Sequence, residues 1–231
     1  MTKNFNDKKI FFVGSGAIAT ALGNVLVKTA EHDVTLITIE KEVADSINRD
    51  HYNNKYFPAI RLEKGLKASV DFSLLKQEAI VFIAIPSAVV VNFISNRDIH
   101  PDSILVNLAK GFGHQHYTIV ESLNKLLPNK ICSLKGPSFA REIMNNQPTA
   151  MTLGAEDGTL YPIFLELFKE TLIYTDYTDD VYGVEILSIL KNIYAIAIGV
   201  VDAQFESPNL KYLIFTKALY EMRNLLILFG R

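Results

Sequence analysis

The chain has 231 residues, about half of them apolar, and its 23 Lys and Arg nearly balance its 25 Asp and Glu. This length and composition suit a soluble globular protein with a sizeable buried core. No basic cluster interleaved with aromatic residues is present, so we expect no nucleic-acid partner.

A single cysteine, Cys132, cannot form an internal disulfide, and the N-terminal stretch Met1–Asp7 is polar rather than an apolar signal core. We therefore expect a protein of the reducing cytoplasm. The longest apolar run, Ile193–Val201, has about half of the roughly 20 residues that a membrane-spanning helix needs, and Lys191 and Asn192 directly precede it. No membrane insertion is predicted.

Short β-branched runs alternate with longer helical patterns along the first 180 residues. A parallel sheet covered by helices produces this alternation, so we predict an α/β fold: a Rossmann-like, mostly parallel sheet with helices on both faces. An apolar-periodic helix is expected over Leu160–Phe168. The predicted strands are Ile10–Val13, Val34–Ile39, Ile80–Ile85, Ile104–Leu108, Ile131–Leu134, Ala150–Leu153 and Leu172–Thr175.

The pattern changes after the turn-forming Tyr177-Thr178-Asp179-Asp180. Two long helical segments follow, Gly183–Val201 and about Leu210–Phe229, with no strand between them. We therefore divide the chain into a dinucleotide-binding Rossmann domain over residues 1–180 and a truncated all-helical domain over residues 181–231.

A glycine turn follows the first predicted strand and precedes a helical run. Its sequence is Gly14-Ser15-Gly16-Ala17-Ile18-Ala19, a G-x-G-x-x-A pattern. Gly14 permits the tight turn, Gly16 lets the backbone approach a pyrophosphate, and Ala19 allows close helix packing. The helix N-terminus offers N–H groups to phosphates. Two glycines in a loop can also be a simple turn, but the strand and helix on either side favour dinucleotide binding.

Glu40 follows the second predicted strand, about 20 residues after the glycine turn, where a carboxylate can accept hydrogen bonds from a ribose 2′-hydroxyl. The same carboxylate would repel a 2′-phosphate, which favours NAD over NADP. The alternative is that Glu40 is simply a solvated loop residue.

Ligands of open parallel sheets bind beyond the carboxyl ends of the strands. Three segments there draw attention: Ile83–Ser87, Asn107–Gly113 and Leu134–Ala140. Lys110 precedes a glycine and can bind an anion, or it is a surface charge. Ser138 can cap a helix that starts near Phe139 while its hydroxyl stays near a ligand, or it is an N-cap only.

A narrow polar stripe crosses the apolar helix predicted after residue 182. A helix this apolar should be largely buried, and its polar face should meet water, a cleft or the other domain. Lys191 within the stripe is costly to bury without a partner, and a partly desolvated Lys suits proton transfer. An ordinary amphipathic helix remains the alternative. The stripe consists of Glu185, Ser188, Lys191, Asn192, Ala195, Gly199 and Asp202.

At these residues the chain resembles the bacterial NAD(P)-dependent glycerol-3-phosphate dehydrogenase family, with motifs in the same order along nearly its whole length. The stretches that carry the resemblance are Gly14–Leu22, Asn54–Ile60, Ala84–Ser87, Ala109–Gly111, Gly136–Glu142, Gly183–Glu185, Leu190–Asn192 and Asn209–Met222.

The resemblance implies oxidation of sn-glycerol 3-phosphate to dihydroxyacetone phosphate, or the reverse, with hydride passing between C2 and the nicotinamide. It also assigns roles. Lys191 corresponds to the family's catalytic Lys, and Lys110 to a Lys that contacts substrate and cofactor. Gly136 and Ser138 correspond to substrate contacts, and Ala17, Ile18 and Ala140 to cofactor contacts.

Several positions depart from the family pattern. Ala19 replaces the third glycine of the turn, Leu187-Ser188 replaces a frequent Gly-Gly, and Ile39 stands where an Arg is often found, which again favours NAD. The resemblance also implies a further segment beyond Arg231, with an Arg-Asn pair that grips the substrate phosphate.

Three alternatives to this dehydrogenase remain open. One is a non-catalytic nucleotide-binding remnant, and the others are dehydrogenases of the 3-hydroxyacid and 6-phosphogluconate types, which also use a glycine turn and a helical Lys-Asn. His114-Gln115-His116 offers too few ligands for a zinc site, so no metal is predicted. A homo-oligomer is possible.

Overall fold

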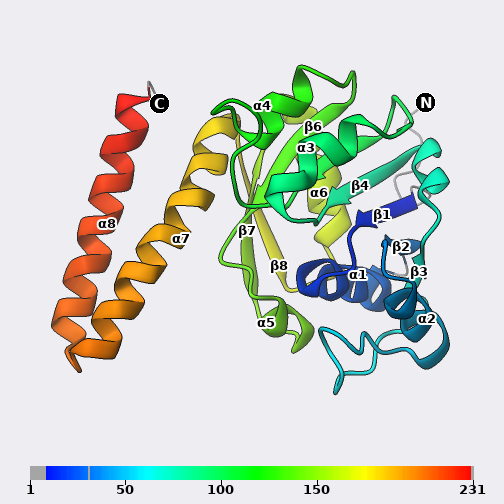
Figure 1. The fold of residues 1–231 in the computed structure, drawn as a ribbon, viewed down its shortest axis with the longest axis horizontal. Helices are drawn as coiled ribbons and strands as arrows, with labels where there is room; N and C mark the ends of the chain where they lie inside the picture. The colour runs from blue at the N-terminus through cyan, green and yellow to red at the C-terminus, as the bar shows by residue number, and fades with distance from the viewer. Residues whose placement is uncertain (1–8, 31, 230–231) are drawn as a thin grey trace.

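The computed structural model describes residues 9–30 and 32–229, so Met1–Asp7 and Arg231 lie outside the described residues. Within these ranges the strands form one eight-stranded sheet in the order β3-β2-β1-β4-β5-β6-β7-β8 (Figure 1). Neighbouring strands are parallel except β6 and β7, which run antiparallel. The predicted Rossmann-like, mostly parallel sheet is confirmed. The strands are β1 Lys9–Val13, β2 Val34–Ile37, β3 Lys67–Ser69, β4 Ala79–Ile83, β5 Ile104–Asn107, β6 Lys130–Lys135, β7 Thr149–Gly154 and β8 Ile173–Thr178.

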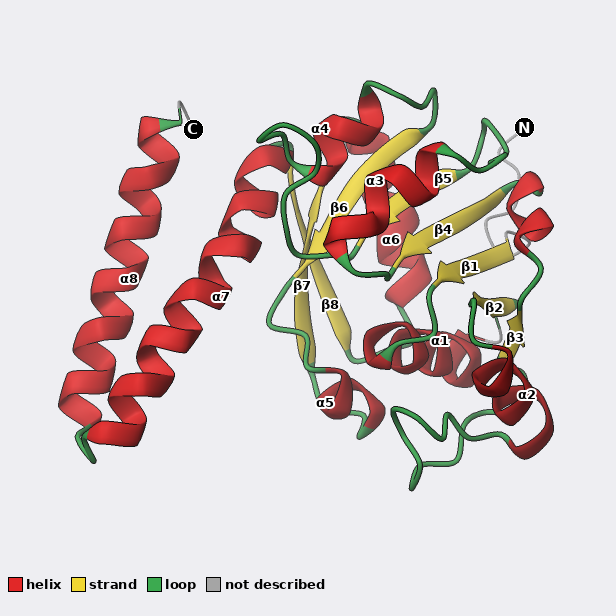
Figure 2. Cartoon of the chain, viewed as in Figure 1, coloured by secondary structure: helices red, strands yellow, loops and turns green. Residues whose placement is uncertain are grey.

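Helices cover both faces of the sheet (Figure 2). Side chains alternate along β1, so Ile10 and Phe12 belong to one apolar cluster with α1 and α6, whereas Phe11 and Val13 belong to a second cluster with α3 and α4. Burying an aromatic side chain such as Phe12 contributes roughly 1.5–3 kcal/mol. The helices are α1 Ala17–Ala30, α2 Lys41–Asp50, α3 Ser87–Ser95, α4 Ile119–Asn124, α5 Ala140–Met144, α6 Tyr161–Phe168, α7 Val181–Gln204 and α8 Pro208–Leu228, with short 3₁₀ helices at Phe72–Lys76 and Gly158–Leu160.

Strand boundaries differ from the predictions at the carboxyl ends of the strands, where ligands of such sheets bind. The second and fourth strands end at Ile37 and Ile83, two residues earlier than expected. Ile39 and Ile85 are β-branched like the strand residues, but both line a cavity beyond the strand ends. The strand β3 was not predicted, because three residues that include Lys67 and Ser69 carry too little apolar pattern.

The helices α7 and α8 form an antiparallel hairpin at one side of the sheet, with α8 outermost (Figure 1). Asp180 caps α7 by accepting a hydrogen bond from the Gly183 N–H at 2.9 Å, which explains why this helix begins two residues before the predicted start. Ser207 caps α8 in the same way, and Lys211 pairs with Asp202 across the turn at 2.8 Å.

The expectation that α7 is largely buried is wrong. Its first turns pack on the sheet, where Glu185 and Ser188 of the polar stripe are buried, but farther along Ile193 and Ile196 are 57% and 71% exposed. Among the described residues α7 is also the one helix long and apolar enough to span a membrane. Polar groups are buried in its first turns, where it packs on the sheet, and the absence of membrane insertion stays a prediction.

Candidate active site

The glycine turn joins β1 to α1 at the carboxyl end of the parallel strands. Gly14 has φ 113°, and a Cβ on it would lie 2.5 Å from the carbonyl oxygen of Ala84. A Cβ on Gly16 would meet nothing within 4 Å, so the backbone there is open to a ligand. Ala17 begins α1, and Ala19 is fully buried in the core. The turn therefore needs glycine at position 14 for its shape and leaves position 16 approachable.

Asn53 ties this turn to a distant loop. Its side chain is fully buried, and its Nδ2 donates to the carbonyl oxygen of Ser15 at 2.9 Å and to Thr20 Oγ1 at 2.8 Å. Ser15 Oγ in turn donates to Thr38 Oγ1 at 2.8 Å, beyond the end of β2. Asn53 begins the Asn-x-x-Tyr-x-Pro stretch that is part of the family resemblance, but the sequence predicts no role for it.

A cavity of about 350 Å³ lies over the glycine turn. Its walls include Gly14 and Gly16, the aromatic side chains of Tyr56, Phe72 and Phe93, and the carboxylate residue Glu40. Apolar walls suit a flat base, a carboxylate suits a ribose, and the N-terminus of α1 suits a pyrophosphate. The residues present therefore fit a dinucleotide.

Glu40 has a partner that sequence reasoning missed. It takes the N-cap position of α2 without capping through its side chain, and its carboxylate accepts a hydrogen bond from Lys55 Nζ at 2.5 Å. This hydrogen bond raises the pKa of Lys55. A 2′-phosphate would be repelled by Glu40 and attracted by Lys55. The preference for NAD therefore stays a prediction.

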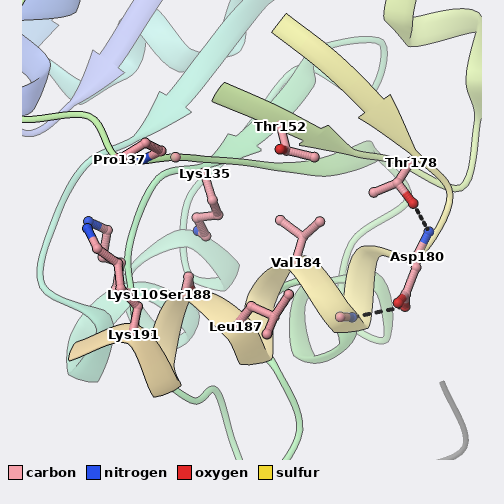
Figure 3. Close-up of a pocket in the computed structure, with 12 residues that line it drawn as sticks. Lys110, Lys135, Pro137, Thr152, Thr178, Asp180, Val184, Leu187, Ser188 and Lys191 are labelled. Atoms are coloured by element: carbon pink, nitrogen blue, oxygen red, sulfur yellow. Dashed lines mark hydrogen bonds between the residues drawn. The ribbon is translucent and has the colours of Figure 1, made fainter. Parts of the chain in front are cut away.

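Two further cavities adjoin at the ends of β5 and β6. One, of about 420 Å³, extends to Ile18 on α1 and Ser138, and the other, of about 410 Å³, extends to Lys191 on α7. Lys110, Lys135 and Gly136 line both. Figure 3 shows the three lysines at one end of the second cavity, with Thr178 and Asp180 at the other. The fold thus brings all the predicted substrate and catalytic residues, Lys110, Gly136, Ser138 and Lys191, to adjoining cavities.

The cationic end of this site has unusual electrostatics. Partial burial and the neighbouring ammonium group of Lys191 lower the pKa of Lys110. The Lys191 ammonium also lies 5.3 Å from the ring centre of Phe139. Two ammonium groups that face one cavity favour an anionic ligand there.

Three predicted site residues lie in the stretch from the end of β6 to the first residue of α5. A Cβ on Gly136 would collide with the carbonyl oxygen of Ala150, so only glycine fits. The expectation that Ser138 caps the next helix is wrong, because the N-cap position of α5 falls on Phe139 and Ser138 Oγ lies 3.4 Å from the Gly136 carbonyl oxygen. Its hydroxyl still lines a cavity. Ala140 begins α5 and packs against the apolar core.

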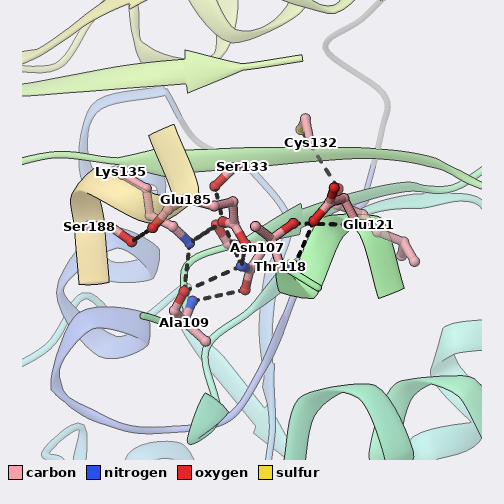
Figure 4. Close-up of polar contacts among 10 residues, drawn as sticks. Asn107, Ala109, Thr118, Glu121, Cys132, Ser133, Lys135, Glu185 and Ser188 are labelled. Carbon is pink, nitrogen blue, oxygen red and sulfur yellow. Dashed lines mark hydrogen bonds and ion pairs between the residues drawn. The ribbon is translucent and has the colours of Figure 1, made fainter. Parts of the chain in front are cut away.

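A buried polar cluster connects the sheet to α7, and sequence reasoning missed it (Figure 4). Glu185 is 1% exposed and accepts hydrogen bonds from Asn107 Nδ2 at 2.9 and 3.1 Å and from Ser133 Oγ. Lys135 Nζ lies 3.0 Å from its carboxylate. The sequence placed Glu185 on the polar stripe of the helix, but helical spacing alone does not predict which strand residues Glu185 contacts.

No metal site emerges from the described residues. In the ranges 9–30 and 32–229, no group of three or more His, Cys, Asp or Glu side chains could hold an ion. His114 and His116 lie in the loop before α4.

Comparisons with known proteins agree with this architecture. The sequence model of the NAD-dependent glycerol-3-phosphate dehydrogenase N-terminus matches residues 9–160, and that of the C-terminus matches residues 180–231. A "Glycerol-3-phosphate dehydrogenase [NAD(P)+]" of Leptospira biflexa is 34% identical over 230 residues, which cover 96% of this chain and 69% of that protein. A protein of the same name from Methanothermobacter thermautotrophicus is 31% identical over 218 residues, which cover 93% of this chain and 67% of that protein.

Among solved structures, glycerol-3-phosphate dehydrogenase from Coxiella burnetii superposes with a TM-score of 0.89 at 27% identity, covering 98% of this chain and 70% of that one. The chain belongs to the NAD-dependent glycerol-3-phosphate dehydrogenase family.

Proposed function

We propose that the protein transfers hydride between NAD(H) and C2 of sn-glycerol 3-phosphate or dihydroxyacetone phosphate. One observation carries this proposal. Lys110, Lys135 and Gly136 line both a cavity that reaches Ile18 beside the glycine turn and a cavity that reaches Lys191. A nicotinamide on the first side and an acid–base group on the second can therefore meet at one small substrate.

The N-terminal domain, residues 1–180 in our division, would hold the cofactor. When bound, the cofactor accepts or supplies the hydride. The open backbone at Gly16 and the α1 N-terminus, with Ala17 and Ile18, would bind its pyrophosphate. Glu40 would accept hydrogen bonds from the ribose, and Ala140 would contact the cofactor on the other side.

The lysines and the Gly136–Ser138 segment would handle the substrate. Lys110 would attract the phosphorylated substrate or polarise its C2 oxygen, and Gly136 and Ser138 would contact it. Lys191 Nζ would take the proton of the C2 hydroxyl in the oxidation and return a proton to the carbonyl oxygen in the reduction. The exposed second half of α7 leaves Lys191 only partly shielded from water.

The test separates chemistry from cofactor binding. NADH binding is followed by fluorescence titration and turnover by absorbance with glycerol 3-phosphate, for the full chain and for Lys191→Ala and Lys110→Ala. Loss of a positioned acid–base group lowers the rate on the order of 10²–10⁴. We expect Lys191→Ala to lose that much turnover with NADH affinity unchanged, and Lys110→Ala to weaken substrate binding as well.

The outcomes are distinct. A Lys191→Ala variant that keeps the parent's turnover across pH contradicts the catalytic role. A parent chain that binds NADH but oxidises or reduces none of these substrates is a nucleotide-binding protein without dehydrogenase activity. That outcome supports the non-catalytic remnant, the alternative outside the enzymes. Turnover with a 3-hydroxyacid or 6-phosphogluconate instead would identify a different substrate.

A further inference from the structure

Lys135 is a buried cation at the centre of the site, and no role in the proposed reaction has been given to it. Its side chain is 6% exposed at the end of β6, and it lines both cavities that meet at Lys110. A buried ammonium group is costly unless its donors are satisfied, so the partners of Lys135 show what it does.

Three acceptors surround the Lys135 ammonium group. Its Nζ donates to the carbonyl oxygens of Asn107 at 2.9 Å and Ala109 at 2.6 Å, and it lies 3.0 Å from the Glu185 carboxylate. An ammonium group has three N–H donors, and all three are thereby used. Lys135 consequently has no donor left for a phosphate or a C2 oxygen, and Glu185 balances its charge.

The same three contacts join the two halves of the site. Asn107 and Ala109 are in the segment directly before Lys110, and Glu185 lies on α7 upstream of Lys191. Asn107 strengthens the link, because its side chain accepts from the Ala109 N–H at 3.0 Å and donates to Glu185. Figure 4 shows Lys135, Asn107, Ala109 and Glu185 as one cluster.

We propose that Lys135 is a positioning residue, which fastens the backbone before Lys110 to Glu185 on α7 and so sets the separation of Lys110 and Lys191. The proposal rests on the proposed function in that these two lysines act on one substrate. Without Lys135, the unpaired Glu185 carboxylate would be buried, and α7 would shift or admit water to relieve it.

The test compares Lys135→Met, Lys135→Arg and a matched control, Lys130→Met. Lys130 lies on the same strand and also pairs with a carboxylate, Asp157 at 2.6 Å, but both side chains are exposed. Cross-linking of Lys110 to Lys191 by a short amine-reactive reagent, mapped by mass spectrometry, reports their separation without any need for turnover.

We expect Lys135→Met to reduce the Lys110–Lys191 cross-link severalfold. Lys135→Arg should restore much of it, because it returns a cation to Glu185, and Lys130→Met should leave it unchanged. If Lys135→Met does not fold, Glu185→Gln replaces it, with the same expected loss of the cross-link. An unchanged cross-link in a folded Lys135→Met or Glu185→Gln protein overturns the proposal.

Turnover gives a separate readout. Where the parent is active, Lys135→Met should lower kcat while NADH affinity stays at the parent's value. If the parent shows no turnover at all, the proposed function fails, but the cross-link still decides the role of Lys135. The two ideas can therefore fail independently.

Discussion

The clearest quantitative prediction concerns Asn53, which holds the glycine turn from a loop far away in the sequence. In Asn53→Ala, the two hydrogen bonds that Asn53 Nδ2 donates are lost, to the Ser15 carbonyl oxygen at 2.9 Å and to Thr20 Oγ1 at 2.8 Å, together with a longer one that its Oδ1 accepts from the Tyr56 N–H at 3.3 Å. The Ser15 carbonyl oxygen keeps Thr20 Oγ1 as a donor at 3.2 Å, and the Tyr56 N–H keeps the Asn53 backbone carbonyl oxygen as an acceptor at 3.2 Å, so no group is left wholly unpaired. At about 1 kcal/mol for each of the two Nδ2 hydrogen bonds, the free energy of unfolding should fall by about 2 kcal/mol.

For a chain of this size, each kcal/mol lowers Tm by roughly 2–4 °C, so the variant should melt roughly 4–8 °C below the parent. NADH affinity should also fall, by several-fold up to about tenfold, because the backbone that meets the pyrophosphate is no longer fixed. Calorimetry and fluorescence titration measure the two effects.

Asn24→Ala is the matched control. Asn24 is also a buried Asn that ties α1 to the same long loop, but its Oδ1 accepts from the Glu63 N–H at 2.7 Å, away from the turn. This variant should lose stability and keep its NADH affinity. If Asn53→Ala and Asn24→Ala bind NADH equally well, the claim that Asn53 shapes the cofactor site is refuted.

Four further predictions follow from charges and exposure. Lys191→Met should raise the pKa of Lys110, measured by pH-dependent labelling, because a neighbouring cation is removed; an unchanged midpoint would show that the two groups do not interact. Because folding lowers the pKa of Lys110, its protonation destabilises the fold at pH values below the folded-state pKa. In denaturant titrations, the free energy of unfolding should therefore rise with pH between that pKa and the higher pKa of an ordinary lysine. In NADH and NADPH titrations, Glu40→Ala should relax the preference for NADH and Lys55→Met should sharpen it; equal effects from both would contradict the opposed roles of this pair. Because α8 exposes apolar side chains, the backbone amides of residues 212–229 should exchange hydrogen faster than those of β1, or the chain should self-associate in sedimentation experiments. Amides of residues 212–229 that are as protected as those of β1 in a proven monomer would refute this.

Much of the fold follows from patterns that act over a few residues. β-branched runs separated by helical periodicity predict a parallel sheet, because each strand buried on both faces must be apolar throughout. The turn at Gly14 and Gly16 is equally local, since its steric requirement depends on one strand and one helix. The list of site residues around Lys110, Gly136 and Lys191 came from residue types at strand ends and from family resemblance.

Other features depend on contacts between segments far apart in the sequence. No periodicity or motif in the sequence connects the residues of three such contacts. These contacts are Lys55 with Glu40, Asn53 with Ser15, and Lys135 with Glu185. A charged residue on a stripe has the same sequence signature whether it meets water or a strand, and only packing distinguishes the two. Sequence alone thus determined the sheet, the glycine turn and the kind of chemistry, whereas the tertiary structure decided which charges neutralise one another, because that depends on distances in space.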